Sequence, residues 1–365
     1  MTRRHTSPAA VPLDDEDLLA EILLRLPSNP SSLPRSSLVR KGWRSIATDA
    51  AFCRRFRTHH RKPPILGVFK RDNNHREVDL VFTSVLDPPD RLPTERFSLR
   101  PGGDDGARLV LFHPLSGDRR TMAIPPEFAD SGYLVHNGDV LCAAGDDQDH
   151  VHGDCHSTPF KVVLVGSRPG GMPHRAVAAV YSSETGMWGD LLMATQACAG
   201  IVTGHPCTII GNAMYWCLNG NGDGILEFDL DKHSLTVIDR PPAAPVRTNS
   251  WIIRGEDGGV GIALLSYPDL QLWDRKVNRD GAATWVLRKT ACMKGMLASE
   301  PASANIRGYD EDTDAIFMSM HRDPDSNNLA IVQLESMRVK ECQGSFLDGF
   351  YLPFADFYTH STVRA

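Results

Sequence analysis

The chain has 365 residues and a formal net charge of -6, with 41% hydrophobic and 23% charged residues. This composition is typical of a folded globular protein and excludes a disordered chain; the length allows one large domain with a small one, or two ordinary domains. No apolar run approaches the roughly 20 residues that a membrane-spanning helix needs, so we expect no membrane insertion. The first ten residues, MTRRHTSPAA, lack the apolar segment of a secretory signal. We expect a cytoplasmic and/or nuclear protein that is not secreted.

The negative net charge is unevenly distributed along the chain. Residues 1–62 contain 12 Lys and Arg against 6 Asp and Glu, which gives this segment a charge of +6 and leaves -12 for the remainder. The arginines of this basic segment flank apolar positions, and no aromatic residues alternate with them as platforms for stacking bases. We therefore expect no nucleic-acid partner. The 8 cysteines occur singly, without a CxxC pair, which favours free cysteines in a reducing compartment.

The sequence predicts a disordered segment over residues 1–10 and three short helices over residues 11–58. The first helix has a wide apolar stripe made by Leu18, Leu19, Ile22, Leu23 and Leu26. Pro27 ends it, and Pro34 fits the first turn of a second helix that carries Leu38, Val39, Trp43 and Ile46. Asp49 is the expected cap of a third helix, AAFCRRF. Three helices of this size expose more apolar surface than they can bury among themselves.

Four consecutive acids precede the first helix, and they raise the question of a catalytic or metal-binding cluster. They are Asp14, Asp15, Glu16 and Asp17. At a helix N-terminus, carboxylates cap unpaired N–H groups and meet the positive end of the helix dipole. We therefore interpret them as helix-capping residues.

A linker is expected at residues 59–64, where two prolines follow a basic cluster, and residues 65–365 are predicted to be all-β. Short apolar or alternating runs are separated there by turn sequences such as SGD, NGNGDG, GEDGG and RDGA. The predicted fold class is thus α+β multidomain, with a small helical unit followed by a larger β domain.

Several of these runs repeat one unit, a strand, a polar turn and a second strand. Examples are VLFHPLSGDRRTMAIP, VAAVYSSETGMWGDL and ILEFDLDKHSLTVIDRP, and the anchor positions are Phe112, Tyr181, Phe228, Trp273 and Val332. Their spacing is near or above the length of a propeller blade, so the β domain is predicted to be propeller-like with about six blades. Strands in residues 65–85 and 346–358 are expected to close the ring, because an open propeller exposes sheet edges.

Two segments imitate metal sites. GDDQDHVHGDCH (residues 145–156) is rich in Asp, His and Cys, but no second ligand group stands at a recognisable spacing, and a loop between blades is the favoured interpretation. NGNGDGILEFDL (residues 219–230) lacks the acidic first and last ligands of a calcium loop, and a hairpin turn explains it better. We find no nucleotide-binding or hydrolase motif, and expect no cofactor, no metal and no catalytic residue. Catalytic residues drawn from different blades would leave no local motif, however.

The helical segment LLAEILLRLPSNPSSLPRSSLVRKGWRSIATDAAFCRRF resembles the F-box, a three-helix module that docks substrate receptors of ubiquitin ligases onto a Skp-type adaptor. The following HHRKPPILGVF and the β-rich remainder resemble the F-box-associated region of plant F-box proteins, particularly those of grasses. Arg40 and Gly42 depart from the residues common at these positions in the family. The resemblance implies an adaptor-binding set formed by Leu18, Ile22, Leu26, Pro27, Leu38, Val39 and Trp43. Leu19, Leu23, Ile46 and Phe52 would then hold the helices together.

What the resemblance implies is a non-catalytic, substrate-recognition subunit of an SCF-type cullin ubiquitin ligase. Its partners would be the Skp-type adaptor, cullin through that adaptor, and a protein target held by the β domain; the residues that bind the target are unknown. Two alternatives remain open at the level of sequence. One is a propeller that binds a ligand or glycan, and the other is an adaptor-binding scaffold without ligase output.

Overall fold

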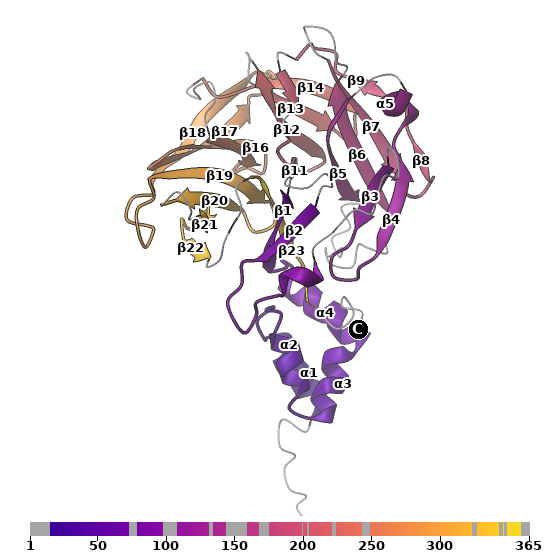
Figure 1. Ribbon diagram of the computed structural model, residues 1–365, viewed down its shortest axis with the longest axis vertical. Coiled ribbons are helices and arrows are strands. Elements are labelled where there is room, and N and C mark those ends of the chain that lie inside the picture. The colour runs from indigo at the N-terminus through magenta and orange to yellow at the C-terminus, as the bar shows by residue number, and fades with distance from the viewer. Residues whose placement is uncertain are drawn as a thin grey trace, which may run out of the picture.

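A computed structural model gives the fold, with a helical unit below a larger β domain in Figure 1. The description covers residues 15–72, 79–97, 108–130, 134–143, 159–167, 175–198, 200–202, 204–220, 224–242, 249–322, 327–342, 346 and 349–358. The expected disordered segment, residues 1–10, lies outside these ranges. Within them, no helix combines the length and the hydropathy that crossing a bilayer requires.

The helical unit, residues 15–60, contains four helices where the sequence predicted three. They are α1 (Glu16–Leu24), α2 (Ser32–Ser37), α3 (Lys41–Thr48) and α4 (Ala50–His60). Two of the expected caps are confirmed, since Asp15 accepts hydrogen bonds from the N–H groups of Asp17 and Leu18, and Asp49 accepts one from Phe52. Helix α4 runs to His60, so the predicted linker at residues 59–64 begins two residues too early.

The predicted second helix is divided because its backbone leaves the helical conformation at Arg40, which is extended (φ -152°, ψ 158°). Two serine side chains precede the break. Ser36 Oγ donates to the carbonyl of Ser32, and Ser37 Oγ donates to that of Pro34. Serine side chains that bond the backbone compete with helix continuation, and apolar periodicity alone does not register this.

The core of the helical unit includes a residue from the far end of the chain. Phe357 is fully buried among the side chains of the helices, with Leu19, Leu23, Leu24, Leu33, Ala47, Phe52 and Phe56. The expected helix-packing residues Leu19, Leu23 and Phe52 are indeed buried, and Ile46 packs against them half-buried. The β domain was predicted to extend to residue 365, but Phe357 belongs to the helical core, whereas the next residue, Tyr358, packs against the first blade.

The β domain is a propeller with five blades of three to five strands. In the first blade, the strand order is β2–β1–β23, with β1 (Ile65–Asp72), β2 (Asp79–Ser84) and β23 (Tyr351–Ala355). The second has the order β5–β6–β7–β8, with β9 also on β7: β5 (Leu134–Cys142), β6 (Phe160–Ser167), β7 (Ala176–Ser182), β8 (Met187–Trp188) and β9 (Leu192–Met193).

The other three blades follow in chain order. The third has the order β10–β12–β13–β14, with β11 also on β12: β10 (Gly200–Val202), β11 (Thr208–Ile210), β12 (Ala213–Gly220), β13 (Gly224–Asp229) and β14 (Ser234–Asp239). The fourth comprises β15 (Asn249–Arg254), β16 (Val260–Ser266), β17 (Asp269–Val277) and β18 (Ala283–Cys292). The fifth comprises β19 (Ser303–Asp310), β20 (Ala315–His321), β21 (Asn327–Gln333) and β22 (Val339–Cys342).

The expectation of about six blades is not confirmed. A further sheet has two described strands, β3 (Arg108–Phe112) and β4 (Arg119–Ala123), and short helices η2 (Thr94–Arg96) and α5 (Pro126–Asp130) interrupt the predicted all-β region. The estimate divided chain length by blade length. Residues 98–107 and 144–158, which that estimate included, lie outside the described residues. The expected ring closure is confirmed, because β23 pairs antiparallel with β1.

Hydrophobic clusters join the second blade to the third, the third to the fourth, the fourth to the fifth and the fifth to the first. Buried side chains of the second and third blades share one cluster around Trp216, and the fourth and fifth share another around Trp251. The second strands of the blades are buried along nearly their whole length, as β16 and β20 show. Neighbouring blades cover both faces of these strands, so continuous apolar runs such as GIALLS replace simple alternation.

The helical unit and the propeller are joined by polar contacts as well as by Phe357. Asp90, which follows β2, accepts hydrogen bonds from Ser31 N (2.9 Å) and Asn29 Nδ2 (3.0 Å) in the helical unit. Asp356 N donates to the carbonyl of Pro64 (3.2 Å), which holds the end of the chain against the linker. The helical unit is therefore fixed to one side of the propeller.

Candidate functional site

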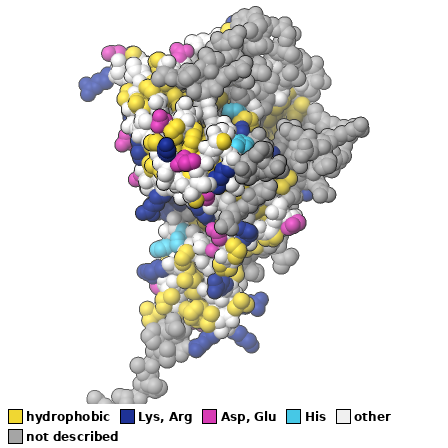
Figure 2. Space-filling view, turned by 60° about the vertical axis from the view of Figure 1, so that its left-hand side comes forward, with side chains coloured by type: hydrophobic (Ala, Val, Ile, Leu, Met, Phe, Trp, Pro, Cys, Tyr) yellow, Lys and Arg dark blue, Asp and Glu magenta, His cyan; other side chains and the backbone are white. Residues whose placement is uncertain are grey.

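An apolar face on the helical unit is the first candidate site. Four large hydrophobic side chains are exposed there: Leu18 (50%), Ile22 (43%), Leu38 (84%) and Val39 (58%). Leu18 and Ile22 lie one turn apart on α1, on a face next to that of the buried Leu19 and Leu23. Figure 2 shows hydrophobic side chains gathered over this lower, helical part of the molecule. Because no neighbouring element of the described chain covers these side chains, they form a ready surface for another protein.

The other three residues of the predicted adaptor-binding set differ in their surroundings. Pro27 is exposed, just past α1. Leu26 and Trp43 are half-buried and pack against the helical core. These two residues support the helices directly, whereas the four exposed residues have no comparable packing role.

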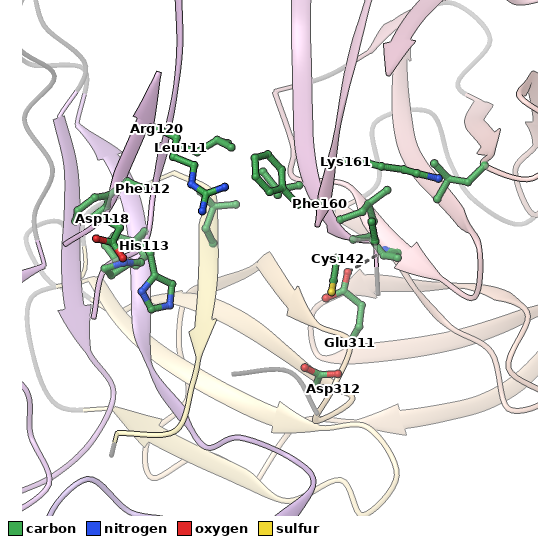
Figure 3. Close-up of a pocket in the computed structure, with 18 of the residues that line it drawn as sticks. Leu111, Phe112, His113, Asp118, Arg120, Cys142, Phe160, Lys161, Glu311 and Asp312 are labelled. Carbon is green, nitrogen blue, oxygen red and sulfur yellow. Dashed lines mark hydrogen bonds between the residues drawn. The ribbon is translucent and has the colours of Figure 1, made fainter. Parts of the chain in front are cut away.

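A cavity of about 1060 Å³ in the propeller is the second candidate site (Figure 3). Its walls come from the two-stranded sheet β3–β4, from the first four blades and from the turn between β19 and β20 of the fifth. Its charged lining residues are Asp118, Arg120, Lys161, Arg254, Glu311 and Asp312. The lining residues Val110, Val140 and Leu352 are exposed to solvent, so the cavity is open.

A hydrogen-bonded turn between β3 and β4 forms one wall. Ser116 Oγ lies 2.9 Å from His113 Nδ1 and donates to Asp118 Oδ2 at 2.8 Å. His113 Nε2 in turn lies 3.4 Å from a carboxylate oxygen of the buried Asp356. Arg120 lies over the Phe160 ring, with its guanidinium carbon 5.2 Å from the ring centroid. This wall is therefore linked to the segment that inserts Phe357 into the helical core.

Glu311 and Asp312 lie on the opposite side of the cavity from His113 and Arg120 (Figure 3). Burial raises the pKa of Glu311 to about 7, and the charges of Asp310 and Asp139 act in the same direction. A hydrogen bond from Ile209 N to Glu311 Oε1 (2.9 Å) opposes the shift without cancelling it. A carboxyl group with this pKa can donate or accept hydrogen bonds near neutral pH.

A second buried carboxyl lies on the inner strand β5. Asp139 Oδ2 accepts a hydrogen bond from Cys207 Sγ at 3.0 Å. Burial raises the pKa of both groups, and the Asp139 charge raises that of Cys207 further. A thiol with a raised pKa is a poor nucleophile, so this pair is structural.

Only one of the two segments that imitate metal sites lies among the described residues. Residues 145–156 lie outside the described residues. The hairpin predicted for residues 219–230 is confirmed by the antiparallel pairing of β12 with β13, which flanks the turn. Across the described ranges, no group of three His, Cys, Asp or Glu side chains is placed to hold a metal ion.

Sequence reasoning did not find the cavity residues. Glu311 and Asp312 stand in the run YDEDTD, which looks like an ordinary solvated turn. Lys161 and Arg254 lie at opposite ends of apolar strands, where a single charge is common. Their only shared property is their position at one end of the propeller ring, which no local sequence signal encodes.

Comparisons with known proteins add little beyond the fold. No family model and no curated protein matches the chain. Among solved structures, the Dos1 propeller has a TM-score of 0.34 and 9% identity, over 77% of this chain and 60% of that one. The β-propeller domain of the Trilobed protease from Pyrococcus furiosus has a TM-score of 0.30 and 9% identity, over 77% and 85%. Prolyl oligopeptidase B from Galerina marginata has a TM-score of 0.34 and 10% identity, over 92% and 44%. The assignment as a β-propeller therefore rests on the strand order and pairing of this chain.

Proposed function

We propose that this protein is the substrate-recognition subunit of an SCF-type cullin ubiquitin ligase. The observation that carries the proposal is the exposure of four large apolar side chains on the helical unit, Leu18, Ile22, Leu38 and Val39. All four belong to the set that the F-box resemblance assigns to adaptor binding. A Skp-type adaptor covering this face would remove its apolar surface from water, which is favourable by about 25 cal/mol per Å².

In this function the chain performs no chemistry itself. The helical unit docks on the adaptor, and the propeller holds a protein target near the ubiquitin-charged enzyme on the cullin. The contribution is an increased effective concentration of target lysines. Phe357 and Asp90 connect the helical unit to the propeller, which supports this function. A receptor fixed to its docking module holds its target at a defined position.

A co-purification experiment with the full chain tests the proposal. The wild-type protein should retain a Skp-type adaptor and cullin, and the double variant Leu38→Asp/Val39→Asp should lose both. These side chains are exposed, so the variant should unfold at the same temperature as the wild type. Val286→Asp, at an exposed valine on β18, is the matched control and should still bind. Failure of the wild-type chain to retain any Skp-type adaptor would contradict the proposal.

A second candidate function is a ligand-binding propeller that acts without an adaptor, and the open cavity of about 1060 Å³ favours it. Deleting the helices is an unsuitable test, because this would expose Phe357. The Leu38→Asp/Val39→Asp variant separates the two functions: it abolishes the first and leaves the second unchanged. An adaptor-binding scaffold without ligase output would retain adaptor and cullin but transfer no ubiquitin to any co-purified protein.

A further inference from the structure

The cavity in the propeller presents charges of both signs in equal number. Arg120, Lys161 and Arg254 are basic, and Asp118, Glu311 and Asp312 are acidic. The formal charges therefore cancel when Glu311 is ionised. A small ion of either sign would meet repulsion from one of the walls, and no described group of side chains there is placed to hold a metal.

Several of these groups have unused hydrogen-bonding capacity. Among the described residues, the Lys161 ammonium and the Asp312 carboxylate make no hydrogen bond or ion pair, although both side chains are half-buried. The Glu311 carboxylate accepts bonds from the backbone N–H groups of Ile209 and of Glu311 itself, and each of its oxygens has two lone pairs. Partly desolvated charges without partners are unfavourable, so a ligand that satisfies them gains affinity.

Apolar surface separates the polar groups. Leu111, Phe112 and Phe160 lie between or beside the charged side chains in Figure 3. Val110, Val140 and Leu352 also line the cavity and are exposed to solvent. A ligand that fits must carry C–H surface as well as hydrogen-bonding groups.

We propose that this cavity binds a neutral polyhydroxylated ligand, an oligosaccharide of a few sugar units. A hydroxyl group donates one hydrogen bond and accepts others, so it can donate to Asp312 or Glu311 and accept from Lys161 or Arg254. The C–H faces of sugar rings match the apolar walls. The volume is at the upper end of the range of about 300–1,000 Å³ typical of small-molecule sites, which leaves room for more than one ring.

The inference goes beyond the proposed ligase function and does not depend on adaptor docking. The same chemistry has two sources, a free oligosaccharide or a glycan attached to a protein. In the second case the cavity would recognise a sugar on the target itself, so the experiment includes both forms.

The test uses the full-length protein on an array of neutral and charged glycans, followed by calorimetry with the best free oligosaccharide and with the same glycan on a carrier protein. Inorganic phosphate and spermidine serve as ionic probes. We expect at least one neutral glycan to bind. Lys161→Gln and Asp312→Asn should each weaken binding by about tenfold or more, because each removes a charged hydrogen-bonding partner.

Asp280→Asn, at an exposed loop position outside the cavity, is the matched control and should bind like the wild type. Both cavity variants keep the size of the original side chain, and their thermal unfolding verifies that they fold. Binding only to the carrier-attached form, with the same loss in the variants, supports the proposal and identifies a protein-linked glycan. The proposal is overturned if no neutral glycan binds, if phosphate or spermidine displaces it, or if both cavity variants bind like the wild type.

Discussion

The helical unit and the propeller bury their apolar residues differently. In the propeller, neighbouring blades cover both faces of the middle strands, so β16 and β20 are buried along nearly their whole length. In the helical unit, Leu19 and Leu23 of α1 are buried while Leu18 and Ile22 are exposed, and part of the core is supplied by Phe357 from beyond β23.

This difference shows which region is complete by itself. The ring of blades closes on itself through β1 and β23, whereas the helices need one side chain from the β domain and leave a second apolar face uncovered. The helical unit is therefore attached to the propeller on one side and available to a partner on the other.

Removing the shared side chain provides the strongest test of this comparison. Phe357→Ala should lower the free energy of unfolding by about 3 to 5 kcal/mol, the range for a fully buried phenylalanine. Hydrogen exchange should show the loss of protection concentrated in α1 and α4. Leu352→Ala, at an exposed position on the same C-terminal segment, is the control and should cost far less. Equal losses in the two variants would mean that Phe357 does not complete the helical core.

Two leucines on α1 compare its buried and exposed faces directly. Leu23→Ala should cost about 2 to 5 kcal/mol in urea unfolding, because Leu23 is fully buried. Leu18→Ala should cost less than about 1 kcal/mol, since the side chain is half exposed, and under the proposed function it should weaken binding of a Skp-type adaptor. The comparison breaks down if Leu18→Ala destabilises the free chain as much as Leu23→Ala does.

Loss of the hydrogen bonds between Asp90 and the helical unit should lower the free energy of unfolding by a smaller amount. Asp90→Ala removes the acceptor of the Ser31 N–H and Asn29 side-chain bonds, and should lower the free energy of unfolding by about 2 kcal/mol. Asp87→Ala is the control, because its ion pairs with Arg91 and Lys340 are long, at 3.9 and 3.8 Å. Equivalent unfolding curves for the two variants would show that the Asp90 bonds do not hold the joint.

A pH dependence of the free energy of unfolding is expected at Glu311 in the propeller. Its pKa is raised from 4.5 to about 7, so the folded state binds more protons than the unfolded state between these values. Stability is therefore lost as pH rises through this window. Glu311→Gln should be more stable than the wild type at pH 8 by up to about 3 kcal/mol, with little difference at pH 4. Urea unfolding at both pH values measures this, and Glu335→Gln, at an exposed glutamate, should show no such change.

Local features of the fold could be predicted from sequence because neighbouring residues produce them. Asp15 and Asp49 cap α1 and α4 as expected. The predicted hairpin is also present, since β12 and β13 pair antiparallel. The break at Arg40 was predicted wrongly, and the expected six blades are not confirmed. Two serine side chains that bond the backbone precede the break.

The candidate sites, too, could be predicted from the sequence only in part. The apolar positions of the helical unit are recognisable from their spacing, but that spacing does not separate exposed Leu18 from half-buried Leu26 or Trp43. Burial of a side chain depends on which elements pack against it, and here one of them comes from the other end of the chain.

The sequence by itself determined the existence of a helical unit with excess apolar surface, the β-rich remainder, its repeated strand pairs and the closure of the ring by its terminal strands. These follow from periodicity, capping and turn residues, which act over a few positions. Only the tertiary structure decided that Phe357 completes the helical core and that Lys161 and Asp312 line one cavity. Both arise because ring closure brings residues together that lie far apart in the chain.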